Sequence, residues 1–189
     1  MKKRTIILSL LLFMVALCYA QKVAIKNNLL YDATLTPNLG LEFGLGEKST
    51  LEINAGYNPF TFSDKKKLKH WLVQPEYRWW NCEKFNGSFW GAHIHGGQYS
   101  IANLKLPFGI FPALKGHRYE GFFLGGGVSF GYQWMLGKRW NLETSLGAGY
   151  TYFKYNKYNC PDCGPKLKSG NYNYFGVTKA AISLIYIID

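Results

Sequence analysis

The feature that most constrains this chain is an alternation of apolar and polar residues with a period of two, which runs through nearly all of it after residue 20. Along 140–153, Trp140 and Leu142 share one face, while Asn141 and Glu143 share the other. An extended strand points successive side chains to opposite faces, and no convincing helical periodicity appears in the same region. The pattern predicts eight strands, over residues 22–33, 38–46, 50–58, 71–81, 87–98, 120–135, 140–153 and 172–188.

The connections between these strands alternate in length. An even number of strands, with short turns at one end and long loops at the other, is typical of bacterial outer-membrane barrels. We therefore predict an all-β fold, an eight-stranded antiparallel up-and-down transmembrane β-barrel with both chain ends on the short-turn, periplasmic side. The short turns are 46–49, 82–86 and 136–139, the longer loops are 59–70, 99–119 and 154–171, and 34–37 is a modest exception.

The direction of the apolar face decides between a membrane barrel and a soluble lipocalin-type barrel, because both alternate. The apolar face carries aromatic residues at strand ends with aliphatic or small residues between them, as between Trp140 and Tyr150. The other face carries charges at mid-strand, which would be very costly in lipid. Both observations favour the membrane barrel, with a lumen polar network of Glu42, Glu52, Glu76, Arg78, Glu143 and Lys179.

The first twenty residues have the layout of a secretory signal peptide. Basic residues at 2–4 precede an apolar run over 5–17, which is too short for a comfortable membrane span of about 20 residues. We expect cleavage after Ala20, with a lipidated Cys18 as the alternative, and a single outer-membrane β-barrel domain over 21–189. The expected location is the outer membrane of a Gram-negative bacterium.

Composition removes several other classes of protein. The chain has 22 Lys+Arg against 11 Asp+Glu, with 48% hydrophobic and 17% aromatic residues. Such an apolar chain is neither disordered nor a coiled coil nor collagen-like. Export argues against nucleic acid as the partner of the positive charge, so we expect outer-membrane lipid and lipopolysaccharide as partners of a monomeric barrel.

Four stretches are distinctive enough to carry a family resemblance, namely 27–38, 69–78, 85–87 and 160–164. Together they resemble an uncharacterised outer-membrane barrel family, domain of unknown function 3575. The resemblance implies an eight-stranded barrel of the OmpA/OmpX type. Relatives of this kind are often encoded beside surface-fimbria or adhesin components, which implies a role in surface assembly. The family supplies no catalytic residues, and the last four residues depart from many barrels by not ending on an aromatic residue.

The lumen charges could in principle supply a paired carboxylate site for acid/base chemistry. We favour a hydrogen-bonded, ion-paired plug, because buried charges must be paired. Four glutamates against Arg78 and Lys179 leave acid in excess. Protonation of some glutamates, water or the histidines would then compensate the excess negative charge. Asn54, Gln74, Gln133, His93 and His95 join the same face.

His93 and His95 are weak catalytic candidates, two residues apart on one strand and therefore on one face. Such a pair can bind a metal or support a hydrolase that acts on lipid A, with a serine such as Ser88, Ser100 or Ser129. No Ser-His-acid order with diagnostic spacing exists, so we favour structural histidines. We expect no catalytic residue, no metal and no cofactor.

Cys160 and Cys163 lie in the last long loop, and the default in an exported protein is a local disulfide. The alternatives are a metal half-site completed by His70, His117 or a partner, and a redox-active pair. Cys82 is then an odd thiol in a periplasmic turn.

The long loops are strongly basic, which would attract anionic lipopolysaccharide or an acidic partner, or simply neutralise the outer leaflet. The loop at 99–119 is also unusually apolar, as a lid or a contact surface would be. We expect a non-enzymatic barrel that anchors or assists a fimbria- or adhesin-type surface assembly through 99–119 and 154–171. The alternatives are a lipid A-modifying enzyme and a purely structural barrel. The candidate loop contacts are Lys65, Lys66, Lys67, Lys69, Lys115, Arg118, Lys166 and Lys168.

Overall fold

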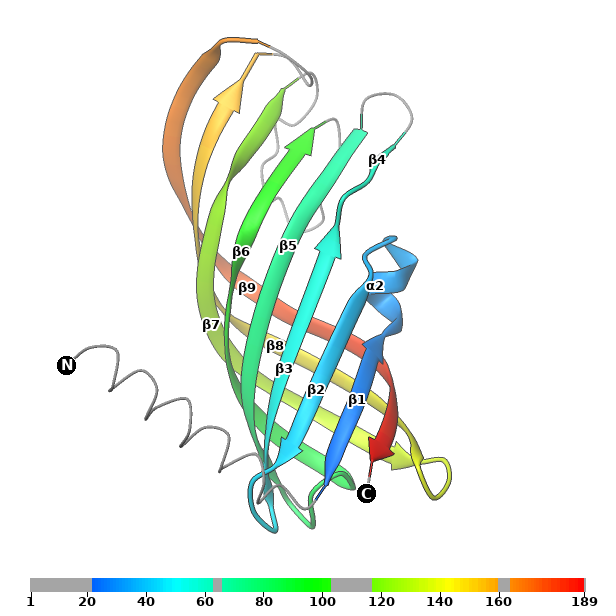
Figure 1. Ribbon diagram of the computed structural model, residues 1–189. Coiled ribbons are helices and arrows are strands. Elements are labelled where there is room, and N and C mark those ends of the chain that lie inside the picture. Colours follow the sequence, from blue (N-terminus) through cyan, green and yellow to red (C-terminus); the bar gives the residue numbers. More distant parts are fainter. Residues whose placement is uncertain (1–21, 63–65, 103–116, 160–163, 189) are drawn as a thin grey trace, which may run out of the picture.

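The computed structural model describes residues 22–62, 66–102, 117–159 and 164–188. Nearly all of them are in antiparallel strands, joined in the order in which they follow one another along the chain (Figure 1). The elements are β1 (Val23–Asn28), α2 (Leu29–Ala33), β2 (Asn38–Gly44), β3 (Ser49–Asn58), β4 (Thr61–Phe62), β5 (Lys66–Trp80), β6 (Gly87–Ala102), β7 (Arg118–Met135), β8 (Trp140–Tyr158) and β9 (Lys166–Ile188).

The eight long strands close into a ring, which confirms the predicted eight-stranded up-and-down fold. Each strand pairs with the next along the chain, β3 with β5, and β1 with β9. The two-residue β4 adds a short pairing to the start of β5. Closure leaves no open sheet edge where all eight strands are present.

The strands are staggered around the ring. The size of the stagger is found by following paired residues once around the ring, from β9 back to β9. The path starts at Gly176 and returns at Ile187, which lies eleven residues further along β9. It passes through Gly149, Gly127, His93, Glu76, Glu52, Glu42 and Ala24. One of these eleven residues of β9 is the extra residue of a bulge, since Gly147 pairs with Lys179 and Ala148 with Val177. Such a stagger requires strands tilted by about 35–45° to the barrel axis.

The expected inside and outside faces are observed. Leu124, Val128 and Leu146 point outward and are 60–62% exposed, whereas Arg78 is fully buried inside. The aromatic residues that bracket the apolar face are also exposed on the outside: Trp71, Trp79, Phe122, Phe130, Trp140 and Tyr150.

The ring is much taller on one side than on the other (Figure 1). Strands β5 to β9 continue far beyond the upper ends of β1 and β2, where the chain turns through α2. We call this part the upper wall, and the rest of the ring the lower barrel. The upper wall consists of residues 66–70, 99–102, 118–121, 151–158 and 166–174.

The upper wall corrects the expected loop boundaries. Segments 59–70 and 154–171 were expected to be loops, but β5 begins at Lys66, β8 ends at Tyr158 and β9 begins at Lys166. Beyond the apolar band the outward face becomes polar, so alternation no longer marks a strand there.

A second correction concerns 29–33, expected as strand and found as the short helix α2. The Asn28 side chain accepts a hydrogen bond from the Leu30 N–H at 3.1 Å and so caps the helix. One helical turn carries too few residues to show a helical period in the sequence. No helix in the described ranges is long and apolar enough to cross a membrane.

Candidate functional site

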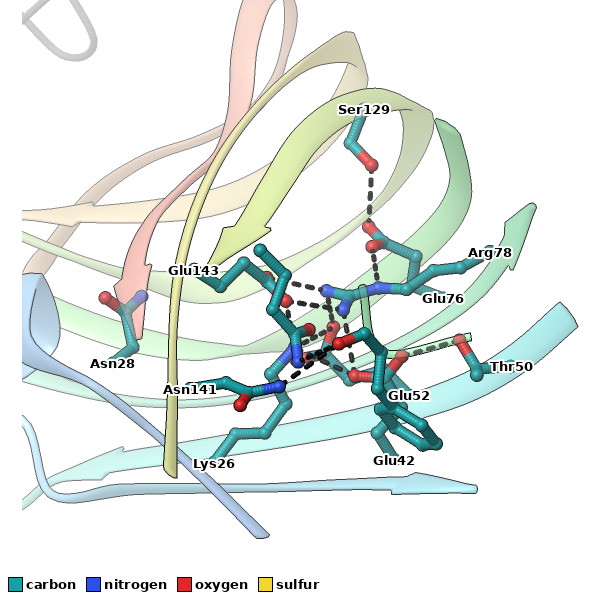
Figure 2. Close-up of polar contacts among 12 residues, drawn as sticks. Lys26, Asn28, Glu42, Thr50, Glu52, Glu76, Arg78, Ser129, Asn141 and Glu143 are labelled. Atoms are coloured by element: carbon teal, nitrogen blue, oxygen red, sulfur yellow. Dashed lines mark hydrogen bonds and ion pairs between the residues drawn. The ribbon is translucent and has the colours of Figure 1, made fainter. Parts of the chain in front are cut away.

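A network of buried acidic and basic side chains lies inside the lower barrel (Figure 2). Arg78 is its centre, and its guanidinium reaches four glutamates. Nε lies 2.7 Å from Glu76 Oε1, and Nη1 lies 2.9 Å from both Glu42 Oε2 and Glu143 Oε2. Nη2 lies 3.1 Å from Glu143 Oε1 and also contacts Glu52. The planar guanidinium suits this role, because its five N–H groups form a rigid fork.

Strand register explains why so many carboxylates need so strong a cation. Glu42 pairs directly with Glu52, and Glu52 pairs directly with Glu76. Like charges directly opposite each other on neighbouring strands are destabilising. Arg78 and Lys179 offset this repulsion, since Lys179 Nζ lies 2.8 Å from Glu76 and 3.3 Å from Glu52.

Lys26 completes the network and was not among the expected site residues. Its Nζ lies 2.5 Å from Glu143 and 2.9 Å from Glu42, and its side chain is buried. The signal was present in the sequence, because alternation places Lys26 on the inward face with Ala24 and Asn28. With Lys26, three cations face four glutamates, so the excess of acid is smaller than Arg78 and Lys179 alone would leave.

Neutral groups hold the carboxylates from the outside of the network. Thr50 donates to Glu42 at 2.5 Å, and Ser129 donates to Glu76 at 3.1 Å (Figure 2). The Arg78 guanidinium also lies over the Phe89 ring, 4.3 Å from its centroid. Each of the four glutamates of the network is paired with at least one cation. This pairing suits a rigid plug and leaves none of these four carboxylates free as a general base.

The two histidines lie above the network and face inward. His93 Nε2 lies 2.9 Å from the Thr178 hydroxyl, and His95 Nε2 lies 2.8 Å from the Thr151 hydroxyl. His93 Nδ1 lies 3.5 Å from Glu76 Oε2, a distance at which a hydrogen bond is weak.

The serines considered as nucleophiles have other hydrogen bonds. Ser129 donates to Glu76, Ser88 accepts from Asn81 at 2.6 Å, and Ser100 donates to Glu120 at 3.1 Å. Within the described ranges, no three His, Cys, Asp or Glu side chains are arranged to hold a metal ion. None of these three serines bonds to a histidine, and the hydroxyls beside the histidines are those of Thr178 and Thr151.

The basic residues expected in loops lie mainly on strands of the upper wall. Lys69, Lys166 and Lys168 are exposed there, and Lys67 lies in β5. Arg118 is paired with Glu120 at 3.0 Å and stacks over the Tyr158 ring. Lys65, Lys115, Cys160 and Cys163 lie outside the described residues, as does the Lys66 side chain.

Cys82 lies at the opposite end, in the turn between β5 and β6. It is exposed and has a free thiol.

Comparison with known families supports the resemblance seen in the sequence. Neither the curated proteins nor the solved structures contain a match. A family model described as "Protein of unknown function (DUF3575)" matches residues 6–188, nearly the whole chain. The chain therefore belongs to the DUF3575 family.

Proposed function

We propose that this protein is a non-enzymatic β-barrel of a Gram-negative outer membrane, and that its upper wall anchors or assists a fimbria- or adhesin-type surface assembly. The observation that carries this proposal is the inside-out distribution of side chains. Ile94, Leu124 and Val128 are at least 60% exposed on the outside, while seven ionised residues lie buried within. Exposure to water would disfavour the apolar outer side chains, and exposure to lipid would disfavour the charged inner ones.

The height of the exposed apolar band supports a membrane location. From Trp79 to Trp71 the outward residues of β5 cover eight positions, which at ~3.3 Å each and a tilt near 40° span ~20 Å, close to the ~25 Å of such bands. The ion network fills the lumen at this level. The arrangement supports a closed anchor rather than a pore.

The upper wall supports the partner-binding part of the proposal. Residues 166–174 of β9 extend beyond the exposed Phe175, by ~20–25 Å at the same rise and tilt. A plain membrane anchor would not need such a wall. Its basic surface would favour an acidic partner in the surface assembly or the phosphates of lipopolysaccharide.

Topology is tested with a membrane-impermeant maleimide on intact cells. The chain carries Cys160→Ser and Cys163→Ser, so that Cys82 is the thiol of the mature barrel that reports on the turn end. We expect no labelling of Cys82 in intact cells, and strong labelling after Cys82→Ser is combined with Lys168→Cys. The opposite pattern would place the turns at the cell surface and overturn the proposal.

Function is tested with a deletion strain. We expect loss of a surface appendage and unchanged lipid A, because Ser88, Ser100 and Ser129 are bonded to groups other than the histidines. Altered lipid A, reproduced by His93→Ala and His95→Ala, would favour the enzyme. Envelope fragility with normal appendages would favour a structural barrel.

A further inference from the structure

Among the residues that the structure describes, strand β9 has an edge with no partner strand in the upper wall. It is 23 residues long, but β1 pairs with it only over Ser183–Ile188. The Asn28 amide adds one further rung, because Nδ2 donates to the Ala180 carbonyl at 3.2 Å and Oδ1 accepts from the Ile182 N–H at 3.3 Å. Along residues 166–171, no strand of the described chain lies on this side. We call these residues the free edge.

The register shows which backbone groups point outward from the free edge. Below the bulge, the Ile187 N–H donates to Arg139 on the β8 side, so odd-numbered residues of β9 face β8. The extra residue of the bulge, Thr178, reverses this order. Asn171 and Ser169 therefore direct their N–H and C=O groups away from β8, into the space beyond the free edge.

Charge at the free edge is one-sided. Lys168 pairs directly with Lys157 of β8, and Lys166 lies two residues further along. None of these three lysines forms an ion pair within the described chain. Adjacent like charges repel, and an anionic group bound beside them would remove that repulsion.

We infer that the free edge binds an extended acidic segment of a partner protein, which adds to β9 as a further strand. This inference rests on the proposed function, since it gives the upper wall its partner chemistry. Backbone hydrogen bonds from Ser169 and Asn171 supply the pairing, and carboxylates on alternate residues of the segment meet Lys157 and Lys168, which share one face. Lysines also keep a sheet edge from pairing with unrelated strands or with another copy, so they select an acidic one.

The test uses the full mature chain in detergent micelles, with two probes. The first is a fluorescent eight-residue peptide of alternating Glu and Thr, and its control replaces Glu with Lys. Binding is followed by fluorescence anisotropy, and hydrogen exchange is measured at the Ser169 and Asn171 amides. We expect the Glu peptide to bind and to slow exchange at both amides, and the Lys peptide to do neither.

Two variants separate backbone pairing from surface charge. Asn171→Pro removes one N–H of the free edge. Asn171→Thr keeps this N–H but also replaces the Asn side chain. We expect about fivefold to tenfold weaker binding for Asn171→Pro, and wild-type binding for Asn171→Thr. The triple change of Lys157, Lys166 and Lys168 to Gln should abolish the salt dependence of binding.

Several results would overturn the inference. Peptide binding without slowed exchange would assign the lysines to simple anion contact. The second probe, lipopolysaccharide micelles that displace the peptide and slow no amide, would assign them to lipid. Slowed exchange that rises with protein concentration in the absence of peptide would make a second copy the partner. A deletion strain that loses its appendage, while the free edge fails these tests, would keep the proposed function and remove this inference alone.

Discussion

The lower barrel and the upper wall are built from the same strands but are stabilised differently. In the lower barrel eight strands close on themselves, and the interior is filled by ionised side chains. In the upper wall five strands continue without closure, and the concave face packs aromatic rings such as Tyr99, Tyr119 and Tyr155. The difference suggests that the lower part carries stability and the upper part is open to a partner. The predictions below test that division.

The largest effect is expected at the centre of the lower barrel. Arg78→Leu would leave four glutamates with two lysines, and removing one partner of a buried ion pair costs ~3–5 kcal/mol in the free energy of unfolding. We expect the variant to unfold at a much lower urea concentration than the wild type. Lys69→Leu, an exposed change in the upper wall, is the matched control and should stay within ~0.5 kcal/mol. Equal effects would contradict the division.

The next effect tests the charge balance of the network. Lys26→Met leaves four glutamates against two cations, whereas Glu143→Gln leaves three against three. We expect Lys26→Met to cost ~3–5 kcal/mol and Glu143→Gln ~1–2 kcal/mol in urea unfolding. The double variant should be more stable than Lys26→Met alone. If Glu143→Gln lowered the free energy of unfolding more than Lys26→Met, the stability of the network would not be limited by its number of cations.

How far these features were predictable depends on the residue pattern. The strands of the lower barrel were predictable because an apolar outer face and a charged inner face alternate cleanly, as at Leu142 and Glu143. The six expected lumen residues lie together, but the contacts of Arg78 depend on strand register, which alternation does not specify. The upper wall was missed because both of its faces carry polar or aromatic residues. Helix α2 was missed because a single capped turn leaves no period.

A moderate effect is expected at Gly97 of β6, just below the upper wall. A Cβ built at Gly97 would meet the Trp71 carbonyl oxygen, so Gly97→Ala forces neighbouring backbone apart. We expect a loss of ~1–3 kcal/mol in urea unfolding. Gly137, in the turn between β7 and β8, has no atom within 4 Å of such a Cβ, and Gly137→Ala should be neutral. A tolerated Gly97→Ala would mean that β5 and β6 can move apart at this position without loss of stability.

The smallest effect is expected at the free edge, and it separates the two sides of one strand. Asn171→Pro removes an N–H that points away from β8, so we expect a change of no more than ~0.5 kcal/mol in the free energy of unfolding. Gly170→Pro removes an N–H that points toward β8, where Gly170 pairs with Tyr155, and should cost ~1–3 kcal/mol. A Cβ at Gly170 would also meet the Tyr155 ring, so Gly170→Ala is the control that separates this clash from the loss of the N–H. If both proline substitutions lowered the free energy of unfolding equally, residues 166–171 would be paired on both sides and the upper wall would have no free strand edge.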